Sequence, residues 1–209
     1  MRTFVAVAIF CVILGVAVWT GLGRAGLKGP EVIVLGAAPP AAKTVGIDRF
    51  KGGEAKPIKP FAFLDAEGRK TDLSDFSGRM VLLNLWATWC APCVKEMPSL
   101  DRLQAALGGR DFQVVALSVD RGGRDVVEPF LKNLGVQNLG LYLDPPNAAM
   151  SALGPRGLPT TLLVGPDGQE LGRVEGAVEW DSPEVIAFLR KQLGGRGPAR
   201  DSGMVKTGG

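Results

Sequence analysis

The run from Met80 to Trp86 constrains the fold of this chain more than any other segment, because all but one of its seven residues are apolar. A strand without polar alternation is typical of a sheet that is covered on both faces. Pro92 follows shortly afterwards, and proline is favourable in the first turn of a helix. Apolar residues then recur at helical spacing as far as Leu107, which predicts a helix over residues 92–107. The chain must therefore cover a buried sheet with helices on both sides.

The same alternation of strands and helices continues toward the C-terminal end. Turn residues at 66–68 and 166–168 predict two β-hairpins, and Ser182 is a favourable N-cap for a last helix. The predicted strands are residues 61–64, 80–86, 112–119, 141–143, 160–164 and 170–175, and the further predicted helices are residues 125–134, 148–153 and 183–193. This order indicates an α/β fold, with a mixed central sheet, helices on both faces and an N-terminal β-hairpin extension.

The ends of the chain differ in composition from this domain. Residues 4–22 carry no charge and are about 19 residues long, close to the length that crosses a membrane, so we expect residues 1–22 to be an uncleaved transmembrane anchor. A cleaved signal peptide is the alternative, although its apolar core is usually shorter. Residues 23–60 are rich in Pro, Gly and Ala and are predicted to be a linker, within which residues 31–35 stay unassigned. Residues 61–193 form the predicted domain, and residues 194–209 a disordered tail.

Composition excludes several kinds of active site. The 209 residues include no histidine, which excludes Ser-His-Asp and Cys-His catalysis and any metal site that needs imidazole. Three cysteines are too few for a scaffold held together by disulfides. The formal net charge is +3 without a basic cluster, so no nucleic-acid partner is expected. The remaining candidate for chemistry is the close pair Cys90 and Cys93.

The sequence Cys90-Ala91-Pro92-Cys93 places two thiols where the buried strand gives way to the helix. The N-terminus of a helix favours a thiolate and lowers the pKa of a cysteine there, in this case Cys90. Cys93, one turn further, is close enough to attack a disulfide formed on Cys90. A structural disulfide would close too small a loop to add much stability, and a zinc site would lack two of its four ligands unless carboxylates supplied them. The pair therefore indicates redox chemistry, with no metal and no cofactor beyond its own disulfide.

Two motifs extend this interpretation. The first is Trp86-Ala87-Thr88-Trp89 directly before the cysteines, with Lys95-Glu96-Met97-Pro98 after them, and the second is Gly157-Leu158-Pro159-Thr160-Thr161. Together they resemble the thioredoxin superfamily and, within it, the membrane-anchored TlpA/ResA branch of periplasmic thioredoxin-like proteins, its TlpA-type members most of all. The resemblance covers residues 61–193 and the N-terminal anchor. It implies a thioredoxin-like fold and an enzyme, a thiol–disulfide oxidoreductase.

The resemblance also implies a role for Glu96. In this branch a glutamate three residues after Cys93 lies near the thiols and tunes them, because a carboxylate raises the pKa of a nearby thiol and can accept its proton. The alternative is a solvated Glu96 that pairs with Lys95 or Arg102. Thioredoxin itself has a buried aspartate where this chain has Asn84. Since Asn84 cannot take a proton, any proton transfer would fall to Glu96.

The other expected site residues form a surface for the substrate. The resemblance implies that the Leu158–Pro159 peptide bond is cis and that backbone groups of Leu158 bind an extended substrate segment. Trp89 is the better candidate for a contact surface, since interfaces favour tryptophan, whereas Trp86 is expected to pack against the sheet. No role follows from the sequence for Trp180. The expected substrate-binding residues are Trp89, Ala91, Pro92, Leu158 and Pro159.

Members of this branch are usually reductants in an oxidising compartment. We therefore expect a monomeric, single-pass protein of the bacterial inner membrane with its catalytic domain in the periplasm. The client would be a protein with an oxidised cysteine pair, in cytochrome oxidase copper-site assembly or cytochrome c maturation, and a membrane electron donor would re-reduce the enzyme. Two alternatives remain. One is a disulfide-forming oxidase of the same fold, and the other is a non-enzymatic Cu(I) chaperone that binds copper through the two thiolates.

Overall fold

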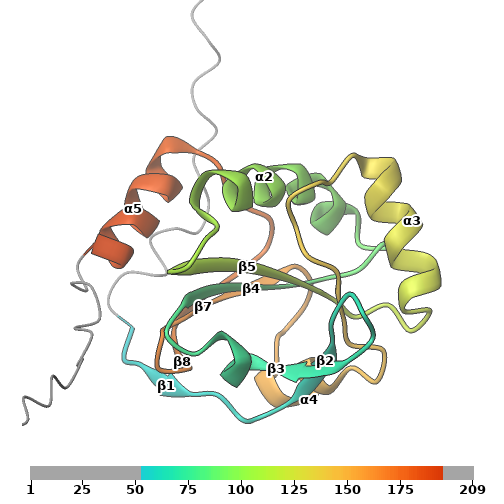
Figure 1. Ribbon diagram of the computed structural model, residues 1–209, viewed down its shortest axis with the longest axis horizontal. Coiled ribbons are helices and arrows are strands. Elements are labelled where there is room, and N and C mark those ends of the chain that lie inside the picture. Colours follow the sequence, from blue (N-terminus) through green and yellow to red (C-terminus); the bar gives the residue numbers. More distant parts are fainter. Residues whose placement is uncertain (1–52, 195–209) are drawn as a thin grey trace, which may run out of the picture. The chain divides into compact units, whose positions relative to one another are not determined.

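The computed structural model describes residues 53–194, which form one mixed sheet with helices on both faces (Figure 1). The order of its strands is β1-β8-β7-β4-β5-β6-β2-β3. The strands are β1 (Lys56–Pro57), β2 (Ala62–Leu64), β3 (Lys70–Asp72), β4 (Met80–Trp86), β5 (Phe112–Ser118), β6 (Tyr142–Leu143), β7 (Thr160–Val164) and β8 (Gln169–Glu175). The helices are the 3-10 helix η2 (Leu73–Phe76) and the α-helices α2 (Ala91–Leu107), α3 (Arg124–Leu134), α4 (Ala148–Leu153) and α5 (Pro183–Gly194).

Strand β4 lies inside the sheet and is buried on both faces, as its apolar sequence predicts. It pairs in parallel with β5 and antiparallel with β7, and all seven of its residues are buried. On one face, Leu82 and Trp86 pack with apolar side chains of α2, α3 and α5. On the other face, Leu83 and Leu85 pack with α4, η2 and β2. Two apolar clusters therefore hold the sheet between its helices, which confirms the predicted α/β class.

The two edges of the sheet are formed by short strands. At one edge, β2 and β3 form the predicted N-terminal hairpin, and β2 continues the sheet through one bridge from Leu64 to Leu143 on β6. At the other edge, β1 pairs antiparallel with β8, with Lys56 opposite Glu170. Lys56 and Pro57 lie within the predicted linker and are instead part of the sheet, since a two-residue strand has no periodicity that a sequence can reveal.

Most predicted elements agree with the structure to within one or two residues. Helix α2 begins at Ala91, so that Cys90 is its N-cap, and α3 begins at Arg124. The predicted anchor at residues 1–22, the unassigned residues 31–35 and the tail beyond residue 194 lie outside the described residues. Within residues 53–194, no helix is long and apolar enough to cross a membrane.

Candidate active site

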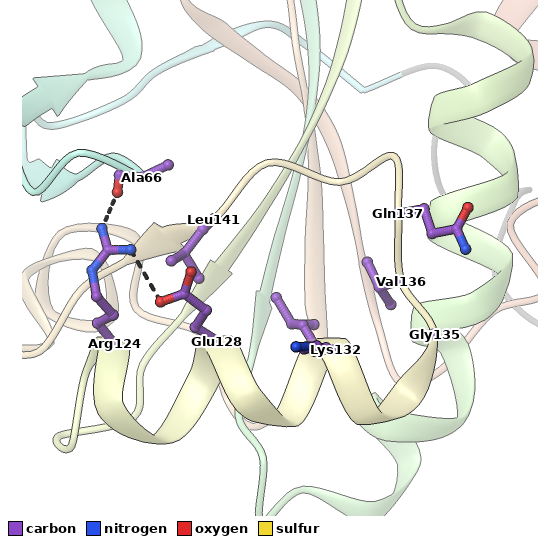
Figure 2. A pocket seen from close by; sticks show the side chains of 9 residues that line it. Ala66, Arg124, Glu128, Lys132, Gly135, Val136, Gln137 and Leu141 are labelled. Carbon is purple, nitrogen blue, oxygen red and sulfur yellow. Dashed lines mark hydrogen bonds and ion pairs between the residues drawn. The ribbon is translucent and has the colours of Figure 1, made fainter.

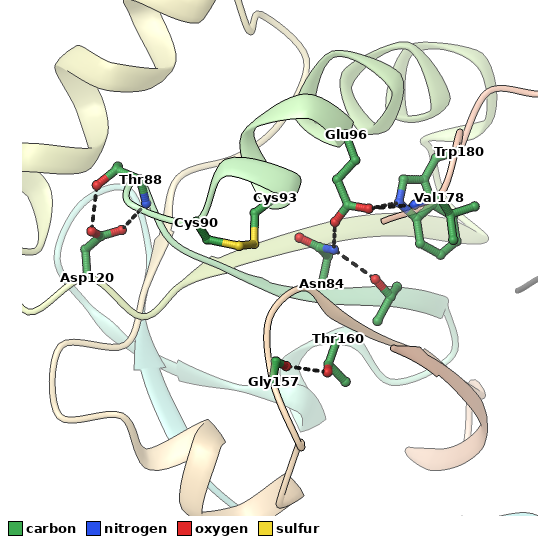
Figure 3. The surroundings of a disulfide bond; sticks show 11 residues. Asn84, Thr88, Cys90, Cys93, Glu96, Asp120, Gly157, Thr160, Val178 and Trp180 are labelled. Carbon is green, nitrogen blue, oxygen red and sulfur yellow. Dashed lines mark hydrogen bonds between the residues drawn. A yellow bond between two sulfur atoms is a disulfide. The ribbon is translucent and has the colours of Figure 1, made fainter. Parts of the chain in front are cut away.

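The two predicted cysteines lie where β4 leads into α2, and they form a disulfide with their Sγ atoms 2.05 Å apart (Figure 3). Cys90 is the N-cap residue of α2, and Pro92 lies in the first turn of the helix. Cys90 is 6% exposed, whereas Cys93 is fully buried. Of the two cysteines, only Cys90 is therefore accessible to a partner molecule. It lies at the positive end of the helix dipole.

The loop before Cys90 is held by Asp120, a residue that the sequence analysis did not select. The Asp120 carboxylate accepts hydrogen bonds from the backbone N–H of Thr88 at 2.9 Å and from its hydroxyl at 2.7 Å. It also accepts one from the Ser118 hydroxyl at 2.8 Å. Asp120 is itself 4% exposed, so these donors replace the water that its charge would otherwise bind. This network fixes the loop that presents Cys90.

Glu96 is buried behind the disulfide, with 2% of its surface exposed. Its Oε1 accepts a hydrogen bond from Asn84 Nδ2 at 2.7 Å, and its Oε2 accepts hydrogen bonds from the Val178 backbone N–H and from Trp180 Nε1, each at 3.0 Å. Burial raises the pKa of Glu96 to about 7, even though these three donors favour the ionised form. Glu96 is therefore a buried acid that can gain or lose a proton near neutral pH, and the alternative of a solvated side chain is wrong.

Asn84 connects Glu96 to the central strands. Its Nδ2 donates both to Glu96 and to the hydroxyl of Thr161 at 2.8 Å, so the amide group is fixed by two bonds. Its Oδ1 accepts no hydrogen bond from any described residue and points toward the Cys93 side of the site in Figure 3. Cys93 and Glu96 are three residues apart on α2, which places them on the same side of that helix. Glu96 and Asn84 thus lie on one side of the disulfide, and Thr88 and Asp120 lie on the other (Figure 3).

An open groove of about 920 Å³ lies on the outer side of the disulfide. Four of the five predicted substrate-binding residues line it together with Cys90, namely Trp89, Ala91, Pro92 and Leu158. The Trp89 side chain is 71% exposed, whereas Trp86 is buried in the core as predicted. The Leu158–Pro159 peptide bond is cis, the isomer that the resemblance implies, and the buried Pro159 does not itself line the groove. We name this surface the active-site groove.

A second hollow, of about 460 Å³, lies beside α3 (Figure 2). Arg124 crosses its rim, where it donates hydrogen bonds to the Ala66 carbonyl and to Glu128, the latter at 3.3 Å. Neither cysteine lines this hollow, nor does any other residue that the sequence analysis selected. The redox chemistry therefore belongs to the active-site groove.

Comparison with known proteins identifies relatives of this chain. Residues 55–169 match the AhpC/TSA family. The thiol-disulfide oxidoreductase ResA of Bacillus thuringiensis is 32% identical over 132 residues, which cover 63% of this chain and 73% of that protein. ResA of Bacillus subtilis is 34% identical over 118 residues, which cover 56% of this chain and 65% of that protein. A solved structure from Chlorobium tepidum, assigned as thiol:disulfide interchange protein DsbE, is 27% identical with a TM-score of 0.57, and the match covers 68% of this chain and 96% of that one.

These relatives agree with the chemistry that the site itself offers. Their names describe thiol–disulfide exchange, and the site presents a disulfide at the start of a helix, beside an open groove. The family match spans more than half of the chain, including both cysteines and the cis-proline loop. The chain therefore belongs to the AhpC/TSA family, has a thioredoxin-like fold and acts as a thiol–disulfide oxidoreductase.

Proposed function

We propose that this oxidoreductase reduces disulfides in partner proteins, with Cys90 as the attacking thiol and Cys93 as the resolving thiol. The observation that carries the assignment is the difference in access. Cys90 lines the active-site groove, whereas Cys93 is fully buried behind it. The N-terminus of α2 also favours a thiolate at Cys90.

The proposed reaction cycle transfers two electrons from the enzyme to the partner disulfide. In the reduced enzyme, the Cys90 thiolate attacks one sulfur of the partner disulfide, and the other partner sulfur leaves as a thiolate. Cys93 then loses its proton and attacks Cys90, which breaks the mixed disulfide and releases the second partner sulfur. The partner has gained two electrons from the enzyme and two protons, one that Cys93 gave up and one from solvent, because Cys90 reacted as a thiolate. The enzyme again carries its Cys90–Cys93 disulfide. A membrane electron donor would supply the two electrons for the next cycle.

Glu96 is the group that we propose accepts the proton of Cys93. A general base works best when its pKa is close to the working pH, and burial raises the pKa of Glu96 to about 7. An ionised Glu96 also disfavours a thiolate at Cys93, which stabilises the disulfide relative to the dithiol. A more stable disulfide makes the reduced enzyme a stronger reductant. The same buried carboxylate therefore supports both the proton transfer and the reducing direction.

The active-site groove is the proposed binding surface for the client. An extended segment around the client disulfide would bind backbone groups of Leu158 in the manner of an added strand. The exposed indole of Trp89 would contact the same segment from the side of the cysteines. The groove is lined largely by apolar side chains, among them Met150 and Val119, which suits an unfolded or extended client segment.

We further propose that residues 1–22 anchor the enzyme in the bacterial inner membrane with its catalytic domain in the periplasm. The support is the uncharged run of residues 4–22 and the resemblance of the motifs to a membrane-anchored branch. On the same resemblance, the client is a protein with an oxidised cysteine pair in cytochrome oxidase copper-site assembly or in cytochrome c maturation.

The reduction potential of the Cys90–Cys93 pair tests the direction of the reaction. Full-length protein would be equilibrated with defined ratios of reduced and oxidised dithiothreitol and glutathione, and the oxidised fraction measured by thiol alkylation. We expect a potential near that of thioredoxin, about −270 mV, since Glu96 disfavours the thiolate. A value near that of the oxidase DsbA, about −120 mV, would show instead that the enzyme forms disulfides. Titration of the reduced protein with Cu(I) tests the chaperone alternative, which tight, stoichiometric binding by the two thiolates would favour.

A further inference from the structure

The loop between β8 and α5, residues 176–182, supplies two of the three hydrogen bonds that the Glu96 carboxylate accepts from described side chains and backbone groups. We name this segment the Trp180 loop. Trp180 is fully buried, and its indole N–H donates to Glu96 Oε2 at 3.0 Å from a position 84 residues further along the chain. Figure 3 shows its ring on the side of Glu96 that faces away from the disulfide. The cycle proposed above assigns no role to this residue.

The Trp180 loop is fastened to the helix that carries Glu96. The backbone N–H of Trp180 donates to the Ser99 hydroxyl at 3.1 Å, and Ser99 lies on α2 three residues after Glu96. Further along the same helix, Arg102 donates to Asp181 at 2.5 Å and to Glu179 at 3.2 Å. The contacts on both sides of Trp180 therefore fix the indole relative to the helix, and not only to the carboxylate.

We propose that Trp180 is a positioning residue for thiol–disulfide exchange, whose indole N–H holds the Glu96 carboxylate in place and sets the pH range in which Glu96 exchanges a proton with Cys93. The proposal rests on the role proposed above for Glu96. It adds that this role depends on a loop outside both sequence motifs.

The surroundings of Glu96 give the indole N–H of Trp180 a strong influence on the ionisation of the Glu96 carboxyl group. The three groups that donate to its carboxylate are all neutral, and Thr161 on β7, which binds the same Asn84, is neutral too. The charged neighbours in the Trp180 loop, Glu179 and Asp181, are paired with Arg102. No cation among residues 53–194 forms an ion pair with the carboxylate. Its ionised form is therefore stabilised by the hydrogen bonds that it accepts, and hydrogen bonds to a buried charge are strong.

The test is the titration of Glu96 in full-length, oxidised Trp180→Phe, followed by the 13C chemical shift of its carboxyl carbon. Phenylalanine keeps an aromatic ring but has no N–H, so the ionised form loses one donor. We expect the midpoint to rise by about one pH unit, the equivalent of one hydrogen bond to a charged group. The inflection that Glu96 causes in the alkylation profile of the reduced pair should move in the same direction.

Trp86→Phe is the matched control, because Trp86 is equally buried but its indole N–H binds no described residue. It should leave the Glu96 midpoint within about 0.2 pH units of the wild type. Ser99→Ala provides a second variant with a smaller change in volume, and it should shift the midpoint upward by less than Trp180→Phe does. An unchanged midpoint in both Trp180→Phe and Ser99→Ala would overturn the proposal.

Glu96→Gln separates this proposal from the proposed role of Glu96 itself. If Glu96→Gln leaves the alkylation profile of the reduced pair unchanged, Glu96 does not tune the thiols. The carboxyl titration in Trp180→Phe would still show whether the indole positions Glu96, so the two failures are distinguishable.

Discussion

Replacement of Glu96 by glutamine should remove the contribution of Glu96 to the pH dependence of stability in the oxidised enzyme between pH 4 and pH 8. Glutamine has the same shape as the protonated acid but carries no charge at any pH. The cysteines are joined in the oxidised state and do not titrate. Of Cys90, Cys93 and Glu96, only the carboxyl group of Glu96 can therefore ionise in the oxidised enzyme.

The size of this contribution follows from the difference between the pKa of Glu96 in the folded protein and its pKa in the unfolded chain. The ordinary pKa of a glutamate, 4.5, applies to the unfolded chain, and burial raises the pKa to about 7 in the folded protein. Between these values the folded protein binds a proton that the unfolded chain has released. The contribution of Glu96 to stability is therefore greatest below pH 4.5 and is lost as the pH rises through 7. One pKa unit corresponds to about 1.4 kcal/mol, so the total loss is about 3 kcal/mol.

Urea denaturation of full-length, oxidised protein at intervals of half a pH unit measures this loss. The difference in unfolding free energy between wild type and Glu96→Gln should change by about 3 kcal/mol across the range, in favour of the wild type at low pH. Glu54→Gln, at an exposed position, controls for the removal of one carboxylate and should follow the wild type. If the difference in unfolding free energy between wild type and Glu96→Gln stays constant within about 0.5 kcal/mol across this pH range, burial does not destabilise the ionised form of Glu96, and the account is refuted.

Two further predictions concern the scaffold. Asp120→Ala should lower the unfolding free energy by about 2 to 3 kcal/mol, because it leaves the Thr88 N–H and the Ser118 hydroxyl without their acceptor. The control Asp111→Ala, at an exposed position, should change the unfolding free energy by less than about 0.5 kcal/mol. Equal effects of the two variants in chemical denaturation would show that Asp120 does not hold the cysteine loop. A fragment of residues 53–194 should unfold cooperatively in a thermal melt monitored by near-ultraviolet circular dichroism, because both apolar clusters lie within it, and a fragment without a cooperative transition would contradict this.

Local sequence patterns predicted the framework of the site well. The apolar run of β4, the proline in the first turn of α2 and the spacing of the two cysteines are all features of consecutive residues. These features are sufficient to place Cys90 at the start of the helix and Cys93 one turn inside it. The cis peptide bond before Pro159 was implied by resemblance alone, since no local pattern distinguishes it from an ordinary loop proline.

The polar contacts that tune the site could not be predicted in the same way. The bond from Trp180 to Glu96 joins residues 84 positions apart, and the bond from Thr88 to Asp120 joins residues 32 positions apart. Both depend on how strands and loops meet in three dimensions, and neither Trp180 nor Asp120 belongs to a motif. A buried glutamate on a helix also looks the same in sequence as a solvated one, which is why both states of Glu96 were open before the fold was known.

The most direct test of the central claim is to trap the mixed disulfide between the enzyme and its client. Full-length Cys93→Ser and Cys90→Ser variants would be expressed in the native cell, and the membranes analysed by non-reducing electrophoresis and mass spectrometry. Our account predicts that Cys93→Ser accumulates a covalent complex through Cys90 that dithiothreitol releases, because the resolving thiol is missing, and that Cys90→Ser traps little or nothing. A complex that accumulates through Cys93 in the Cys90→Ser variant would contradict the assignment of Cys90 as the attacking thiol.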